Sequence, residues 1–124
     1  MPTALVTGGA IRLGRSVALH LAGRGYNIAL QYCSSRESAE QTAKEARNFD
    51  VQCKTYCADF TDFNSAPLLM GQVLADFNSV DLLVNSAANF IQKKIEETSN
   101  SELLDTININ LIAPFILMRE FKKK

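Results

Sequence analysis

The sequence predicts an α/β fold built on a doubly wound parallel sheet. Four short apolar runs alternate with four stretches that have the spacing of amphipathic helices, and such alternation is typical of βαβ units joined by right-handed crossovers. A glycine-rich turn, residues 7–14, connects the first apolar run to the first helical pattern. These observations predict a single domain, residues 1–124, with helices on both faces of the sheet.

The composition is that of an ordinary globular domain. The 124 residues are 47% hydrophobic and 21% charged, and 13 basic side chains balance 13 acidic ones. We therefore expect no broad basic surface for nucleic acid or an anionic membrane. No apolar run approaches the roughly 20 residues that span a bilayer, and the N-terminus lacks the layout of a signal peptide, so we expect a cytoplasmic protein. Three cysteines without a Cys-x-x-Cys pair predict reduced, buried thiols and no metal site.

Four strands are expected, at residues 3–6, 27–32, 51–57 and 81–85. The last of them contains Leu82, Leu83 and Val84 without interruption, as do parallel strands that are buried between two layers of helices.

Each strand is followed by a predicted helix with apolar residues at helical spacing. The apolar faces are expected to contain Leu13, Val17 and Leu21 with Ala18 and Ala22 beside them; Ala39, Ala43 and Ala46; Ala66, Leu69, Met70, Val73, Leu74 and Phe77; and Leu103, Ile107, Leu111, Phe115 and Met118. Two capping boxes, Ser34-x-x-Glu37 and Ser99-x-x-Glu102, should begin the second and fourth helices. A polar loop should cover residues 89–97, and Pro114 should bend or divide the last helix.

The turn Thr7–Gly14 has the residue types of a phosphate-binding site. Its backbone N–H groups and the positive end of the following helix would hold an anion such as a dinucleotide pyrophosphate. Glycines also end strands and cap helices, so the turn alone is weak evidence. The strand before it and the helix after it favour nucleotide binding.

Four motifs along the chain resemble the short-chain dehydrogenase/reductase family. Thr7-Gly8-x-x-x-Arg12-x-Gly14 is similar to the family's Thr-Gly-x-x-x-Gly-x-Gly, with arginine at the middle glycine. Asp59 follows the third strand, where the family places an aspartate on the adenine ring. Asn85-Ser86-Ala87-Ala88 resembles Asn-Asn-Ala-Gly, and the stretch 108–115 resembles the family's Asn-Leu-x-x-Pro/Gly-Phe helix. The Arg12–Ser16 variant, with Tyr32 ending the second strand, is most similar to the pteridine reductase branch.

The resemblance implies a Rossmann-type sheet with the strand order 3-2-1-4 and a nucleotide site whose residues it assigns. The expected cofactor-binding residues are Gly8, Arg12, Leu13, Gly14, Tyr32, Ser34, Ser35, Arg36, Asp59, Phe60, Asn85, Ser86 and Ala87. Asn110 is the implied catalytic residue. Asn108 lies about 200° from it around a helix, so both cannot face one cleft, and Asn108 is expected to be structural. Each role has a structural alternative: Asp59 or Asp62 could cap the next helix, and Asn85 could form hydrogen bonds with the backbone of a neighbouring loop.

The end of the second strand bears on cofactor choice. An NAD site would place a carboxylate there to accept from the ribose 2′-hydroxyl, but no acid occurs before Glu37. The hydroxyls of Ser34 and Ser35 and the guanidinium of Arg36 suit a 2′-phosphate, which favours NADP(H) over NAD(H). Alternatively, Ser34 only caps a helix and Arg36 is solvated.

The residues that the family uses for proton transfer do not occur in this chain. None of its three tyrosines is followed four residues later by lysine, as the family's Tyr-x-x-x-Lys requires. The chain therefore resembles the N-terminal half of a reductase, truncated after the fourth strand and within the long helix that follows it. We expect strand 81–85 to form an exposed apolar edge, the isolated fragment to be marginally stable, and the complete protein to form a homo-oligomer.

The predicted parent is an NADP(H)-dependent oxidoreductase that transfers hydride to a carbonyl or a pterin-like C=N substrate, and the chain alone should be inactive. The alternative is a non-catalytic nucleotide-binding or interaction module of this length. A phosphoacceptor signalling domain would need carboxylates for Mg²⁺ after the first strand, where Thr7 and Gly8 stand.

Overall fold

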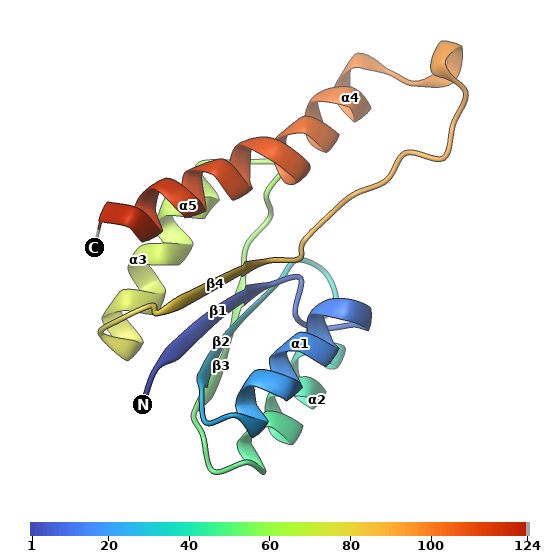
Figure 1. Ribbon diagram of the computed structural model, residues 1–124. Helices are drawn as coiled ribbons and strands as arrows, with labels where there is room; N and C mark the ends of the chain where they lie inside the picture. Colours follow the sequence, from blue (N-terminus) through green and yellow to red (C-terminus); the bar gives the residue numbers. More distant parts are fainter. Residues whose placement is uncertain (124) are drawn as a thin grey trace.

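The computed structural model describes residues 1–123 and contains a four-stranded parallel sheet in the order β3-β2-β1-β4 (Figure 1). The strands are β1 (Thr3–Thr7), β2 (Asn27–Tyr32), β3 (Cys53–Cys57) and β4 (Leu82–Asn85). In the register of the sheet, Leu5 of β1 lies between Ala29 of β2 and Leu83 of β4. The predicted fold class and strand order are confirmed.

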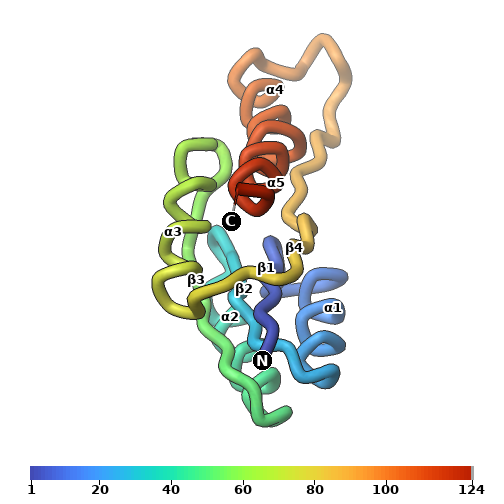
Figure 2. Tube along the Cα trace, turned by 60° about the vertical axis from the view of Figure 1, so that its left-hand side comes forward, coloured from blue at the N-terminus to red at the C-terminus, as the bar shows by residue number. Residues whose placement is uncertain are grey.

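Helices cover both faces of the sheet (Figures 1 and 2). The α-helices are α1 (Arg12–Gly23), α2 (Arg36–Arg47), α3 (Ser65–Phe77), α4 (Asn100–Ile107) and α5 (Ala113–Lys123). Helices α1 and α2 lie on one face, and α3 and α5 on the other. Because side chains alternate along a strand, β1 contributes Leu5 to the core beneath α3 and α5, and Ala4 and Val6 to the core beneath α1 and α2.

Helix α1 packs on the sheet through small residues. Its buried positions are Gly14, Ala18 and Ala22, whereas Val17 and Leu21 are half-buried and Leu13 is 71% exposed. The predicted apolar stripe is therefore confirmed at Ala18 and Ala22 and wrong at Leu13. A face of glycine and alanine lets the helix backbone approach the turn that precedes it more closely than leucine would.

Helix α2 begins later than predicted. Its N-cap is Ser35, whose side chain makes no capping hydrogen bond, and its first residue is Arg36. The capping box expected at Ser34 and Glu37 is therefore absent. The buried face is as expected, with Ala39, Ala43 and Ala46 on the sheet side. Since Ser34 does not cap the helix, its hydroxyl is available to the cleft described below.

Helices α4 and α5 form one continuous helical path through a π-helical segment, Asn108–Ile112 (Figure 1). The predicted capping box at the start of α4 is confirmed: Ser99 Oγ accepts from the Glu102 N–H at 3.1 Å, and the Glu102 carboxylate accepts from the Ser99 N–H at 3.1 Å. Pro114 lies in the first turn of α5, directly after the π-helical segment. The helix is thus divided by a change in hydrogen-bond pattern at the predicted place.

The outer face of the α4–α5 path is apolar, contrary to expectation. Its predicted core stripe is exposed, whereas Ala113, Ile116 and Leu117 are buried against α3 and the sheet; the exposed stripe contains Leu103, Ile107, Leu111, Phe115 and Met118. The 24-residue path Asn100–Lys123 has a mean hydropathy of 1.3 over its most apolar window. By length and composition alone it could cross a membrane, which corrects the expectation that no segment is long enough.

Strand β4 occupies one edge of the sheet, as expected. Leu82, Leu83 and Val84 are half-buried, in contrast to the fully buried β1. The expectation of a strand buried on both faces was therefore wrong for the described residues, because only β1 pairs with β4 among them. This edge offers unpaired backbone groups and apolar side chains to a further strand.

Candidate nucleotide-binding cleft

A cleft of about 420 Å³ opens where the strands end at their carboxyl edge, the position at which open α/β sheets bind ligands. It is lined by Gly8, Ala10, Ile11, Arg12, Leu13, Gly14, Gln31, Tyr32, Cys33, Ser34, Ser35, Ala58, Asp59, Phe60, Ser86, Ala87, Ala88 and Ile109. The structure therefore brings together eleven of the predicted cofactor residues. Arg36 and Asn85 lie outside the lining, as does Asn110.

The glycine turn fits the sheet and α1 so closely that side chains are excluded at two positions. Gly8 has φ +60°, and a Cβ there would lie 2.9 Å from the Ala87 backbone. A Cβ on Gly14 would overlap the Gly8 carbonyl oxygen and lie 2.7 Å from its carbon. At both positions the distance from the added Cβ to its neighbour is shorter than an ordinary van der Waals contact. The turn therefore presents bare backbone to the cleft.

Arg12 holds the middle-glycine position of the motif in a left-handed conformation, with φ +53°. A side chain in that region costs about 1 kcal/mol or more, which explains why glycine suits the position. Arg12 lines the cleft, is exposed, and has no ion-pair partner among residues 1–123. Its guanidinium is the only cationic group in the lining and is available to an anionic ligand.

Two polar residues that sequence reasoning did not assign hold the turn in place. The Gln31 side chain, 2% exposed, accepts from the Gly8 N–H at 2.8 Å and donates to the Ala58 carbonyl at 2.7 Å. Thr7 Oγ1 accepts from the N–H groups of Ser86 and Ala87, both at 3.0 Å. A glutamine within the buried run of β2 was the available signal, because buried amides are normally hydrogen-bonded.

The end of β2 and the loop after β3 form the opposite wall. Tyr32, Ser34 and Ser35 face the cleft without a carboxylate on their segment, whereas Asp59 is the only acid in the lining. The Asp59 carboxylate accepts from both the N–H and the hydroxyl of Thr61, at 3.0 and 2.8 Å. The Asp62 carboxylate accepts from the N–H of Asn64, the residue directly before α3, at 3.1 Å, so the structural alternative fits Asp62, whereas the Asp59 carboxylate binds Thr61. Phe60 is buried in the core and supports this wall.

The two asparagines of the π-helical segment bind different loops. The Asn108 Nδ2 donates to the Thr61 carbonyl at 2.9 Å. The Asn110 carboxamide accepts from the N–H of Asn89 at 2.8 Å and donates to its carbonyl at 2.7 Å. Ile109, between them, is the residue of this segment that lines the cleft. Because Ile109 is hydrophobic, nothing in the sequence indicated that it lines the cleft.

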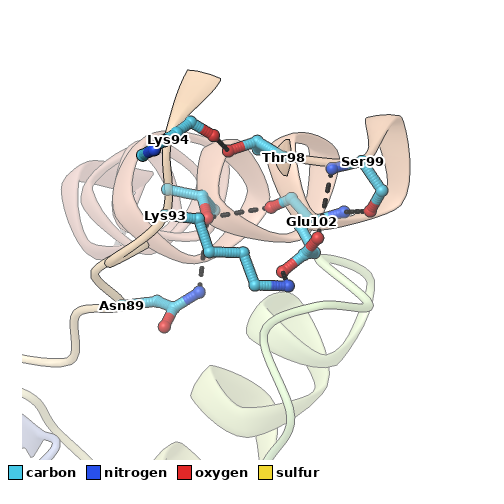
Figure 3. Close-up of polar contacts among 7 residues, drawn as sticks. Asn89, Lys93, Lys94, Thr98, Ser99 and Glu102 are labelled. Carbon is cyan, nitrogen blue, oxygen red and sulfur yellow. Dashed lines mark hydrogen bonds and ion pairs between the residues drawn. The ribbon is translucent and has the colours of Figure 1, made fainter. Parts of the chain in front are cut away.

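A polar network ties the loop after β4 to α4 (Figure 3). Glu102 binds the Lys93 ammonium at 2.7 Å as well as the Ser99 N–H. The side-chain bond to Lys93 and the Ser99 hydrogen bonds lower the pKa of Glu102 to about 2. Asn89 Nδ2 donates to the Thr106 hydroxyl at 3.3 Å, and Thr106 donates to the Glu102 carbonyl at 2.9 Å. The loop is therefore held at both of its ends.

The cysteines differ from expectation in their burial. All three are free thiols, but only Cys53 is buried. Cys33 lies on the rim of the cleft, and Cys57 donates from its thiol to the Cys33 carbonyl at 3.3 Å. Burial raises the pKa of Cys53 to about 11, and burial together with Asp59 raises the pKa of Cys33.

Comparison with known proteins places this arrangement in one family. The family model for short chain dehydrogenases matches residues 2–124. The chain is 34% identical over 113 residues to the 3-oxoacyl-(acyl-carrier-protein) reductase FabG of Staphylococcus aureus, covering 91% of the chain and 46% of that protein. It is 31% identical over 118 residues to the oxidoreductase YhxC of Bacillus subtilis, covering 94% and 41%. The chain thus spans about half the length of these relatives.

Solved structures share the fold over nearly the whole chain. A short-chain dehydrogenase of Burkholderia cenocepacia in complex with NADP superposes with a TM-score of 0.95 at 25% identity, covering 98% of this chain and 50% of that one. A blue fluorescent protein from a metagenomic library in complex with NADPH gives 0.94 at 28% identity, covering 99% and 51%. With the family model matched from residue 2 onward, the chain belongs to the short-chain dehydrogenase/reductase family.

Proposed function

We propose that this chain is the NADP(H)-binding half of a short-chain reductase. The observation that carries the proposal is the cleft itself: a bare glycine turn beside the start of α1, an unpaired arginine, and two serines where β2 ends. Because the N–H groups of Gly8 and Gly9 donate to Gln31, the backbone of residues 11–13 and the positive end of α1 would hold the pyrophosphate. Ser34 and Ser35 would take the 2′-phosphate, with Arg12 and Arg36 supplying positive charge.

The adenosine end would lie along the wall formed by Asp59 and Phe60, and Ser86 and Ala87 would border the opposite side of the turn. Asn85 ends β4 beside Thr7 and would act through the backbone of this junction. When bound, the cofactor supplies the hydride that a reductase transfers to its substrate. The chain's own residues bind, orient and enclose it.

Asn110 would act as a positioning residue in this half of the protein. Its carboxamide holds both backbone groups of Asn89, which fixes the loop that leaves β4 at the cleft. The family's Tyr-x-x-x-Lys does not occur in residues 1–124. The proton donor of the complete enzyme would therefore come from sequence outside this chain.

The substrate class that we propose is a carbonyl or a pterin-like C=N compound. The relatives include a 3-oxoacyl reductase, which supports a carbonyl substrate. The Arg12–Ser16 variant and Tyr32 support the pteridine-reductase-like alternative. We also propose that the complete protein is a cytoplasmic homo-oligomer.

The test is a fluorescence titration of the full-length protein with NADPH and NADH. We expect tighter NADPH binding, and an Arg36→Ala variant that loses about 10-fold or more in NADPH affinity, as removal of a charge-assisted hydrogen bond predicts. NADH affinity should change little. Arg24→Ala is the matched control, since Arg24 is exposed at the far end of α1.

Equal affinity for both cofactors, or an Arg36→Ala loss shared by the control, would contradict the NADP assignment. Cofactor binding without turnover of any carbonyl or pterin substrate would favour the non-catalytic nucleotide-binding module. Absence of binding to either dinucleotide would refute the proposed function as a whole.

A further inference from the structure

The π-helical segment Asn108–Ile112 joins two loops that border the cleft. Through Asn108 it holds Thr61, in the loop after β3, and through Asn110 it holds Asn89, in the loop after β4. These loops lie on opposite sides of the turn Thr7–Gly14. The two asparagines therefore support different walls of the same cleft.

The hydrogen bond of Asn108 acts on a loop whose own residues hold it at its start and again before α3, where the Asp59 carbonyl accepts from the Ser65 hydroxyl at 2.9 Å. At its start, Ala58 is bound through its N–H to the Tyr32 carbonyl at 2.9 Å and through its carbonyl to Gln31. Beyond Phe60, residues 62–64 are exposed. Asn108 supplies a bond to this part of the loop from outside it, across 47 positions of sequence.

Thr61 transmits that restraint to the cleft. Its N–H and hydroxyl both donate to the Asp59 carboxylate, which lines the cleft, while its carbonyl accepts from Asn108. The position of Asp59 therefore depends on the position of Thr61. Because the acceptor at Thr61 is a backbone carbonyl, the donor at position 108 determines whether the link exists.

We propose that Asn108 is a positioning residue for the adenosine end of the cofactor. Asn108 orients Asp59 through its hydrogen bond to Thr61. In this way it affects the affinity for the adenosine end of the cofactor without contacting the cofactor. This inference rests on the proposed function. Asn110 holds the loop after β4 through its hydrogen bonds to Asn89. A change at Asn110 should therefore alter turnover, whereas a change at Asn108 should alter cofactor affinity.

The test compares three variants of the full-length protein. Asn108→Leu removes the donor at similar volume, and Asn108→Asp replaces it with an acceptor; Asn100→Leu is the control, at an exposed position of α4. Calorimetry with adenosine 2′,5′-bisphosphate measures the adenosine end alone. NADPH-dependent turnover at saturating substrate gives the cofactor KM and kcat separately.

Both Asn108 variants should bind adenosine 2′,5′-bisphosphate about three- to tenfold more weakly, the range for loss of one neutral hydrogen bond. The KM for NADPH should rise by the same factor while kcat stays unchanged, and Asn100→Leu should match the wild type. Unfolding alone would lower kcat without changing KM.

Three results would overturn the inference: unchanged affinity for adenosine 2′,5′-bisphosphate, a fall in kcat without a rise in KM, or failure of both Asn108 variants to fold, which would show a purely structural role. Failure of the proposed function is distinguishable, because the wild type itself would then bind neither NADPH nor adenosine 2′,5′-bisphosphate.

Discussion

Gly14→Ala tests the close contact between α1 and the glycine turn. The added methyl would overlap the Gly8 carbonyl oxygen and lie 2.7 Å from the carbonyl carbon and 3.1 Å from the Gly9 Cα. Ordinary carbon contacts lie near 3.5–4.0 Å, so the first turn of α1 must move by about 1 Å. Such overpacking costs about 1–3 kcal/mol, and the better helix propensity of alanine returns less than about 1 kcal/mol.

The expected result is a net loss of about 1–2 kcal/mol in the free energy of unfolding, or roughly 4–8 °C in Tm for a chain of this size. NADPH affinity should fall as well, because the displaced turn carries the N–H groups. Gly71→Ala is the matched control: nothing lies within 4 Å of its added methyl. It should stabilise α3 by about 0.5–1 kcal/mol. The assay is thermal and urea unfolding of both variants, and a Gly14→Ala protein as stable as the wild type would refute the packing argument.

Three further predictions follow from single side chains. The pKa of Glu102 is about 2, below the usual 4.5. The contacts of its carboxylate therefore stabilise the loop after β4 fully above pH 4.5, and this stabilisation is lost as the pH falls toward 2. Amide hydrogen exchange of the loop should show this pH dependence in the wild type and not in Glu102→Gln. Burial raises the pKa of Cys53 to about 11, so this thiol should react with iodoacetamide much more slowly than the exposed Cys57 thiol. Equal labelling of the two thiols by mass spectrometry would contradict the burial of Cys53. Gln31→Met leaves the half-buried Gly8 N–H and the buried Ala58 carbonyl without their partner and should cost about 2 kcal/mol. Gln41→Met at an exposed site should cost much less in the same urea titration.

The parallel sheet could be predicted from three successive βαβ units with right-handed crossovers, and its strand order from the resemblance to the short-chain family. The cleft at the carboxyl edge follows from that order. Most of its predicted residues come from segments directly after a strand, where position along the chain also determines position in space.

The face of α5, and in part that of α1, was mispredicted for one physical reason. Periodicity selects the largest apolar residues, but α1 packs through Gly14 and the two alanines beside its predicted stripe, and α5 packs through Ala113, Ile116 and Leu117. Which side of a helix meets the sheet depends on how closely the backbones approach. That distance is a tertiary property.

Local sequence patterns could not identify the residues whose hydrogen bonds hold the segments that line the cleft. Gln31 links Gly8 to Ala58, and Asn108 reaches Thr61 across 47 positions. Such pairings depend on which loops the folded sheet brings together. Only the polarity of Gln31 within a buried strand hinted at its role.

The most direct test of the central claim is a crystal structure of the full-length protein grown with NADPH. We expect the pyrophosphate against the backbone of residues 8–13, and the 2′-phosphate within hydrogen-bond distance of Ser34 or Ser35 and of Arg12 or Arg36. A cofactor bound elsewhere, or a 2′-phosphate turned away from the end of β2 into solvent, would contradict it.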